Sequence, residues 1–591
     1  MDRKYSSEEW FDKGLEEFEK GNFAKAIECY TNVIYKDPNN AEAYYNRGLA
    51  YYRVEDFKKS RDDYSKAIQL DSKDSESFVN RGIVFDHLEE YDSAIIDFSQ
   101  AIQIDPEDVK AYNNRGLLYA KKGEHLKAIN DYTKAIELDE TYAYAYYNRG
   151  NAHSKLEEHD KAILDYTKAV QLDPTDEDAF VNRGVSFEEL GDFDKAIIDY
   201  SQAIHLNSKN IQAYNNRGMA YDEIKNYEKA VNDYTKAIEI DPSYIYAYNN
   251  RGFAFENMKR FERAINDYNK AIEIDPQYVR GYNNRGNCYL QLGEYDKALS
   301  DYTKAIKLLP DSSEGYYNRG YLYSQMDENN KAIEDYSRAI LLDPADSVAY
   351  YNRGNSYGKL GEHEKAISDY TTAIDYDPDD AGAYNNRGVT YDEMGEYQKA
   401  IADYSKAIEL DDSYSQAYNN RGFTYNKLSK TEEALKDYTT AIDRDPNYMN
   451  AYFNRGYVYC HLRQFDKAIE DYSKVVEIDP SYSAGFYNRG FAYDELKQYD
   501  SAIIDYSKAI ELDPEDIDGY FNRGILNEKR GNLDMALEDY TKVIEIVPNG
   551  VEHYFRRCKI YFKKKKYLSA LKDIIHIIKA IGRYERTKKS L

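Results

Sequence analysis

The sequence has few cysteines and no long hydrophobic run, and both shortages narrow the class of protein. Its four cysteines, Cys29, Cys288, Cys460 and Cys558, are scattered along 591 residues and form no Cys-x-x-Cys pair. No apolar run approaches the roughly 20 residues that a membrane-spanning helix needs. The charged start of the chain, residues 1–5, lacks the apolar core of a signal peptide. We therefore expect a cytoplasmic protein without a membrane span, in a reducing setting.

Positive charge is also in short supply. The chain has 79 lysines and arginines against 106 aspartates and glutamates, which gives a formal net charge of −27. Such a surface repels phosphate backbones, so we expect no nucleic-acid partner. No phosphate-binding glycine loop or His-Glu-x-x-His helix appears, and the nine histidines are dispersed. We therefore predict no enzymatic activity, no cofactor and no metal site.

A short internal repeat organises the chain. The triplet Asn-Arg-Gly occurs fifteen times, at 46–48, 80–82, 114–116 and onward at a constant interval to 522–524. The register extends by one unit in each direction, so seventeen repeats start at positions 7, 41, 75 and at the same interval to 551. We number the slots of each repeat from 1 to 34. The predicted organisation is an N-terminal lead (1–6), a single solenoid of seventeen repeats (7–584) and a basic C-terminal tail (585–591).

Each repeat is predicted to contain two helices. In the second repeat, Tyr44, Gly48 and Tyr51 share one helical face, and Ser60 and Tyr64 begin a second such pattern. Sixteen repeats have glycine in slot 8 and sixteen have alanine in slot 20, and these small residues would let the paired helices approach closely.

Proline sets the phase of the repeat. All twelve prolines of the chain lie in slot 32, where a proline ends the second helix, as Pro38 does. Asparagine or aspartate often follows two residues later, as at Asn40 and Asp108, and would cap the next helix.

The glycine, aromatic, alanine and proline slots resemble the tetratricopeptide repeat, a helix-turn-helix unit of the same length. Trp10 occupies the slot where that family has tryptophan. The resemblance covers about residues 7–584. It implies an all-α fold, a right-handed α-solenoid superhelix of 34-residue helix-turn-helix repeats, with a concave groove lined by the first helices. One departure is systematic, because slot 7 holds arginine where the family commonly has leucine.

An arginine and an aspartate recur together. Arginine fills slot 7 in sixteen repeats and aspartate fills slot 23 in the same sixteen, from Arg47 and Asp63 to Arg557 and Asp573. We predict a half-buried salt bridge between the two helices of each of these repeats. The alternative is that these arginines contact a ligand.

Asparagine fills slot 6 in fifteen consecutive repeats. Slots 2, 6, 9 and 13 form a stripe about 200° from the buried stripe, so these side chains should face the concave groove. Their neighbours vary widely, which argues against recent duplication as the reason for the constant asparagine. The predicted groove asparagines are Asn46, Asn80, Asn114, Asn148, Asn182, Asn216, Asn250, Asn284, Asn318, Asn352, Asn386, Asn420, Asn454, Asn488 and Asn522.

Two roles remain open for this asparagine ladder. A carboxamide donates and accepts hydrogen bonds, so a row of them can hold an extended peptide backbone. Alternatively, each asparagine bonds an adjacent helix and serves the fold. The ladder is similar to the one in the repeat superhelix of O-linked N-acetylglucosamine transferases, but this chain has no room for a catalytic domain such as those enzymes carry.

Aromatic residues at adjacent slots predict an apolar anchor for a partner, because aromatic clusters are typical binding hot spots. They are Phe423, Phe453, Tyr457, Tyr487 and Phe491. Acidic pairs on the first helices, such as Glu188-Glu189 and Asp222-Glu223, suggest basic partner segments, although a solvated rim explains them equally well.

The C-terminal end differs in charge from the rest. Residues 551–591 hold thirteen lysines and arginines against three acids, a net of about +10. The last helix is rich in isoleucine, at Ile574, Ile575, Ile577, Ile578 and Ile581. This face is either a docking surface, for a second copy or another partner, or a lysine-coated terminal cap.

Taken together, the patterns predict a protein–protein interaction scaffold that binds extended peptide or protein segments in a concave groove. The alternative is a structural spacer or self-assembling solenoid with little groove recognition.

Overall fold

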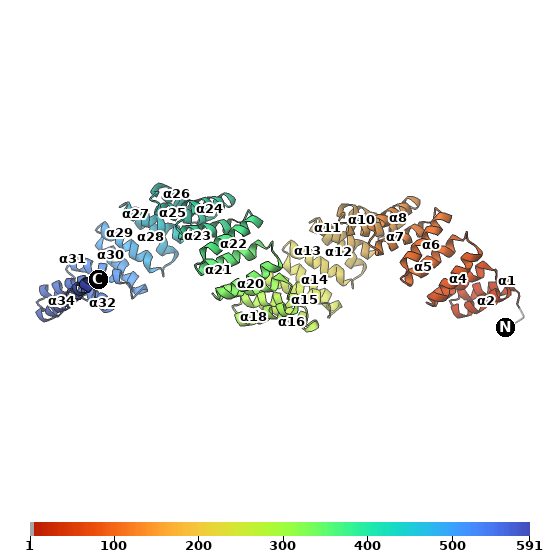
Figure 1. Ribbon diagram of the computed structural model, residues 1–591, viewed down its shortest axis with the longest axis horizontal. Coiled ribbons are helices and arrows are strands. Elements are labelled where there is room, and N and C mark those ends of the chain that lie inside the picture. The colour runs from red at the N-terminus through yellow and green to blue at the C-terminus, as the bar shows by residue number, and fades with distance from the viewer. Residues whose placement is uncertain (1–4, 591) are drawn as a thin grey trace. The chain divides into compact units, whose positions relative to one another are not determined.

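The computed structural model describes the backbone of residues 5–590 and the side chains of residues 5–580. Throughout this part of the chain the regular structure is α-helical, and helix pairs follow one another in chain order (Figure 1). The chain divides into two compact units, Met1–Leu308 and Leu309–Leu591. Within each unit, the two helices of a repeat pack together, and each second helix packs against the first helix of the next repeat.

The first unit holds nine repeats. Its helices are α1 (Ser7–Glu19), α2 (Phe23–Lys36), α3 (Ala41–Arg53), α4 (Phe57–Leu70), α5 (Ser75–His87), α6 (Tyr91–Ile104), α7 (Val109–Lys121), α8 (His125–Leu138), α9 (Ala143–Lys155), α10 (His159–Leu172), α11 (Glu177–Glu189), α12 (Phe193–Leu206), α13 (Ile211–Glu223), α14 (Tyr227–Ile240), α15 (Ile245–Asn257), α16 (Phe261–Ile274), α17 (Val279–Gln291) and α18 (Tyr295–Leu308).

The second unit holds eight repeats. Its helices are α19 (Ser313–Gln325), α20 (Asn329–Leu342), α21 (Ser347–Lys359), α22 (His363–Tyr376), α23 (Ala381–Glu393), α24 (Tyr397–Leu410), α25 (Ser415–Lys427), α26 (Thr431–Arg444), α27 (Met449–His461), α28 (Phe465–Ile478), α29 (Ser483–Glu495), α30 (Tyr499–Leu512), α31 (Ile517–Arg530), α32 (Leu533–Ile546), α33 (Val551–Lys563) and α34 (Tyr567–Ser590).

The predicted phase of the repeat is confirmed at the helix ends. Helix α2 ends at Lys36, just before the turn that contains Pro38, because proline cannot continue a helix. The side chain of Asn40 accepts a hydrogen bond from the backbone N–H of Ala43 and so caps α3. Asp108 caps α7 in the same way.

The glycine of slot 8 lies against the aromatic ring of slot 24. A Cβ atom added at Gly116 would lie 2.6 Å from Cε1 of Tyr132, which is closer than van der Waals contact. Tyr132 is almost completely buried, as are the tyrosines in this slot of most other repeats. The two helices of a repeat are therefore close-packed where the small residues predicted a close approach.

The predicted salt bridge is present in all sixteen repeats that carry the pair. The closest N···O distances are 2.6–2.8 Å, and every aspartate is buried or nearly so. Arg251 donates from Nε and Nη2 to the two oxygens of Asp267, at 2.8 and 2.7 Å. Its Nη1 donates to Oγ1 of Thr235 in the preceding repeat, at 2.9 Å. The arginine therefore joins both helices of its own repeat to the repeat before it.

Candidate functional site

The fifteen ladder asparagines lie in the middle of the first helices, and all are half-buried. Ten of them donate a hydrogen bond from Nδ2 to the slot-5 side chain of the preceding repeat, at 2.9–3.1 Å. The acceptor is a tyrosine hydroxyl or an asparagine Oδ1. The ten are Asn80, Asn148, Asn182, Asn250, Asn284, Asn352, Asn386, Asn420, Asn454 and Asn522. In these repeats the amide N–H serves the stacking of repeats.

A valine or phenylalanine in slot 5 offers no acceptor for this bond. Asn114 and Asn488 follow repeats that have Val79 and Phe453 in slot 5, and within the described part of the chain they make no side-chain hydrogen bond to the preceding repeat. Asn216, which follows Val181, instead bonds the hydroxyl of Tyr200 in the preceding repeat. Asn46, which follows a phenylalanine in slot 5, donates instead to a backbone carbonyl of its own helix, as Asn488 does. The varying tyrosine or asparagine of slot 5 was the sequence signal for the structural role, and we did not identify it from the sequence.

Three of the five predicted aromatic residues line one cavity. Tyr457 from α27, together with Tyr487 and Phe491 from α29, surrounds a space of about 340 Å³ that Asn488 also borders. Phe423 lies elsewhere, with the ammonium of Lys427 over its ring at 4.7 Å from the centroid.

The remaining aromatic residue, Phe453, is partly buried and packs against a hydrophobic core cluster. Its ring packs edge-on against the rings of Tyr472 and Tyr482, at centroid distances of 5.7 and 5.6 Å. Of the five residues predicted to form an apolar anchor, the structure therefore brings Tyr457, Tyr487 and Phe491 together around one cavity.

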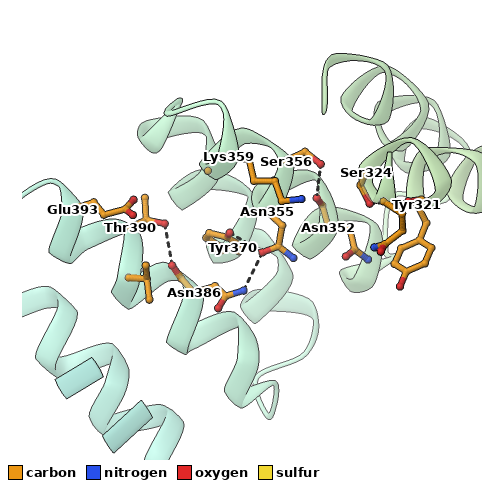
Figure 2. Close-up of a pocket in the computed structure, with 13 residues that line it drawn as sticks. Tyr321, Ser324, Asn352, Asn355, Ser356, Lys359, Tyr370, Asn386, Thr390 and Glu393 are labelled. Atoms are coloured by element: carbon orange, nitrogen blue, oxygen red, sulfur yellow. Dashed lines mark hydrogen bonds between the residues drawn. The ribbon is translucent and has the colours of Figure 1, made fainter. Parts of the chain in front are cut away.

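A second, more polar cavity lies along α19, α21 and α23 and has a volume of about 430 Å³ (Figure 2). Its lining includes the ladder residues Asn352 and Asn386. Asn355 also lines the cavity, and its Oδ1 accepts hydrogen bonds from the Tyr370 hydroxyl at 2.8 Å and from Asn386 Nδ2 at 3.0 Å. Two donors therefore fix the orientation of the Asn355 amide.

The depth of this cavity comes from Gly358 in slot 12. A Cβ atom added there would have only one neighbour within 4 Å, the hydroxyl of Tyr370 at 3.7 Å. In many other repeats slot 12 carries a large side chain, such as Glu188 or Leu290. The missing side chain leaves room above Tyr370.

Slot 12 also forms a row of acidic side chains on α11, α13 and α15. Glu188, Asp222 and Glu256 each accept a hydrogen bond from the tyrosine hydroxyl of slot 24 in their own repeat. Burial raises the pKa of Glu188 to about 7 and that of Asp222 to about 6, since the charged form loses hydration. Burial also raises the pKa of Glu256.

In other repeats, the acidic side chain of slot 12 forms a salt bridge with a lysine in slot 13 of the next repeat. Lys427 Nζ lies 2.5 Å from Asp392, and Lys121 Nζ lies 2.6 Å from Asp86. The repeats after Glu188, Asp222 and Glu256 instead have glutamate, asparagine and glutamine in slot 13. Among the described residues these three carboxyl groups form no salt bridge.

Among the described side chains, no group of three His, Cys, Asp or Glu residues is arranged to hold a metal ion. In the same part of the chain, every helix is too short or too polar to cross a bilayer.

Several solved structures are similar to this chain. No curated protein matches the chain. A chain in the crystal structure of the APC/C hetero-tetramer Cut9–Hcn1 is 16% identical over 81% of this chain and 95% of that one, with a TM-score of 0.36. Yeast Tom70 is 18% identical over 72% and 96%, with a TM-score of 0.36. YrrB, described as a TPR protein with an unusual peptide-binding site, is 27% identical over 31% and 95%, with a TM-score of 0.28.

Family models cover most of the sequence. A model described as TPR repeat matches residues 14–54, 87–123 and 354–395. A model described as tetratricopeptide repeat matches residues 336–368. A further tetratricopeptide repeat model matches thirteen segments, which are 41–74, 109–142, 143–176, 177–210, 211–244, 245–278, 279–312, 313–346, 381–414, 415–448, 450–482, 483–516 and 517–549. With its helix pairs in the same register, the chain belongs to the tetratricopeptide repeat family.

Proposed function

We propose that the chain is a non-catalytic scaffold that binds extended peptide or protein segments along its first helices. Tetratricopeptide repeat scaffolds serve protein–protein interaction in general. The observation that carries the finer proposal is that the two cavities described above open on the stripe of slots 6 and 9. One is lined by Asn352 and Asn386, and the other by Asn488.

The structural bonds of the ladder leave part of each amide for a ligand. In the ten bonded asparagines the Nδ2 donor is engaged, and Oδ1 is the group that can accept a backbone N–H from a bound segment. Asn114 and Asn488 have no inter-repeat bond to lose. These two side chains therefore allow a test of binding with little effect on the fold.

The test begins with a random peptide library selected on the full chain. Selected peptides are labelled, and their Kd is measured by fluorescence anisotropy against the wild type and a variant with Asn114 and Asn488 both replaced by alanine. One hydrogen bond is worth about 1 kcal/mol, so the Kd should rise about fivefold for each asparagine that a peptide contacts. Selection of no peptide, or an unchanged Kd for every selected peptide, would contradict the proposal.

We propose that segments bound along α11, α13 and α15 are basic. Glu188, Asp222 and Glu256 have no counterpart of the lysine that forms a salt bridge with the acidic residue of slot 12 in other repeats. A lysine of the bound segment would take its place. Because their carboxyl groups ionise at raised pKa values, a lysine-containing peptide should bind more tightly as the pH rises from 5 to 8. Affinity that is independent of pH, or that falls over this range, would favour the solvated-rim interpretation.

Self-association through the last repeat remains a second proposal. Leu568, Leu571, Ile575 and Ile578 form an exposed apolar stripe on α34. Ile581 and the tail 585–591 lie outside the described side chains. A concentration-dependent rise in molecular mass by light scattering, lost when Leu571 and Ile578 are replaced by serine, would support this interface. A monomer across micromolar concentrations would refute it.

A further inference from the structure

We infer that α21 and the cavity beside it form a subsite for a primary carboxamide, the side chain of an asparagine or glutamine on the bound segment. This inference rests on the proposed function, because it names a residue type that the segment would carry. The basis of the inference is the set of hydrogen-bond donors and acceptors on the side chains of α21 that no contact within the protein uses.

The first element is a fixed donor. Asn355 accepts two hydrogen bonds through Oδ1, from Tyr370 and Asn386, so its amide cannot flip without losing both. A side-chain hydrogen bond from Asn355 to the Tyr351 hydroxyl uses one N–H of its Nδ2 group. The second N–H of Asn355 is therefore available on the cavity side.

The second element is a fixed acceptor, one helical turn earlier. Asn352 donates from Nδ2 to the hydroxyl of Tyr317 at 3.1 Å and to the carbonyl of Val348 at 3.0 Å. Both its N–H groups are thus used, and its Oδ1 remains to accept. Residues three apart lie on one helical face, and Figure 2 shows the side chains of Asn352 and Asn355 turned toward the same space.

An acceptor beside a donor is the complement of an amide, which offers one N–H and one C=O. The ligand N–H would donate to Asn352 Oδ1, and the ligand carbonyl would accept from Asn355 Nδ2. Lys359, one turn further along α21, also lines the cavity, and its nearest acidic oxygen, on Asp327, is 3.9 Å away. Its ammonium supplies a second donor to the ligand carbonyl.

The same arrangement selects against the two nearest analogues of glutamine. A glutamate carboxylate would satisfy Asn355 and Lys359 but would place an oxygen against Asn352 Oδ1, with no hydrogen between them. A methionine side chain has a similar length but leaves all three groups unpaired. A polar group that a ligand covers without pairing costs more free energy than one hydrogen bond contributes. This penalty is what lets the site favour glutamine over glutamate and methionine.

The depth of the cavity favours a side-chain amide over a backbone amide as the ligand group. The space left by Gly358 lies above the hydroxyl of Tyr370, so a ligand group can reach below the surface of α21. A segment lying across the helix would place its backbone outside and a long side chain inside.

The chain contains its own matched control. Asn148 and Asn151 of α9 have the same spacing, and Asn151 Oδ1 accepts from the Tyr166 hydroxyl at 2.7 Å and from Asn182 Nδ2 at 3.0 Å. Slot 12 of that repeat is Ser154 in place of glycine. The first unit thus holds the same amide network with a shallower space beside it.

The experiment uses saturation-transfer NMR on the full chain with three capped residues: N-acetyl-glutamine N-methylamide and its methionine and glutamate counterparts. All three share one backbone, so a difference reports the side chain. We expect the glutamine compound to bind about 25-fold more tightly than the methionine compound, as two hydrogen bonds of about 1 kcal/mol each predict. Equal binding of all three, strongest binding of the glutamate compound, or no saturation of the glutamine compound would overturn the inference.

Variants locate the signal. Gly358→Leu fills the space with the residue that the same slot has at Leu290, and Asn355→Val installs the residue found at Val389, so both changes have precedents in this chain. Each should lower the glutamine signal by more than half, whereas Ser154→Gly should raise it. No change in either cavity variant would also overturn the inference. If selected peptides still bind through the ladder without any glutamine or asparagine, the proposed function stands and only this subsite fails.

Discussion

Replacing Asn420 by alanine should loosen the stacking of α25 on α23, whereas the same replacement at Asn488 should not loosen its own repeat. Asn420 donates to Oδ1 of Asn385 at 3.1 Å, and Asn385 is completely buried. Asn488 donates only to the backbone carbonyl of Ala484 in its own helix, at 2.8 Å. The two variants therefore make one chemical change in two bonding contexts.

The magnitude follows from the acceptor that is left behind. A buried acceptor without its donor costs about 1–3 kcal/mol. Alanine returns about 0.5 kcal/mol of helix propensity at either site. We therefore expect a local loss of about 0.5–2.5 kcal/mol for Asn420→Ala, and a change between zero and a slight gain for Asn488→Ala.

The assay is amide hydrogen exchange read by mass spectrometry, because the stability of a repeat array is set repeat by repeat and a single melting temperature would average it away. Exchange from α23 and α25 should accelerate about tenfold in Asn420→Ala, and exchange from α27 and α29 should be unchanged in Asn488→Ala. Equal acceleration in the two variants, or none in Asn420→Ala, would refute the division of the ladder by its slot-5 neighbour.

Three further predictions concern the frame that carries the ladder. A double-mutant cycle on Arg251 and Asp267 should show single-variant losses of about 3–5 kcal/mol and a much smaller loss when both become leucine; additive losses in urea titrations would exclude the coupling. Gly116→Ala should destabilise its repeat by about 1–2 kcal/mol despite better helix propensity, because Tyr132 must move, and slower exchange in α7 would show that reasoning to be wrong. Glu188 has an ordinary pKa of 4.5 in the unfolded chain and about 7 in the folded one, so the stability it contributes is complete below pH 4.5 and is lost as the pH rises through 7. Glu188→Gln should therefore raise the free energy of opening of α11 and α12 by about 2 kcal/mol at pH 8, which slows their amide exchange, and should have little effect at pH 4. An equal effect at both pH values would count against the raised pKa.

The fold was predictable because its determinants are local and repeated seventeen times. Pro38 ends one helix and Asn40 caps the next through contacts within a few residues, and neither depends on distant parts of the chain. The pairing of Arg251 with Asp267 was visible as joint presence across repeats, since a buried charge must find its partner.

The site was less predictable, because its residues act across repeats. Whether Asn420 or Asn488 is free depends on slot 5 of the repeat before it. The space at Gly358 depends on where the Tyr370 ring lies, and its residue type alone does not reveal it. Phe453 is an aromatic residue, as an exposed binding anchor would be, but it packs against the core. Only the packing of its neighbours distinguishes these two roles.

The contact from Arg251 to Thr235 has a consequence at the level of the gene. Ser201 holds the same slot one repeat earlier and accepts from Arg217 at 2.9 Å. If residues 211–244 were excised, Arg251 would meet Ser201 in the geometry that Arg217 now has, and no guanidinium would be orphaned. A cassette encoding one whole repeat can therefore be lost or copied by recombination without unpairing a charge, so natural variation in this array is expected in whole cassettes.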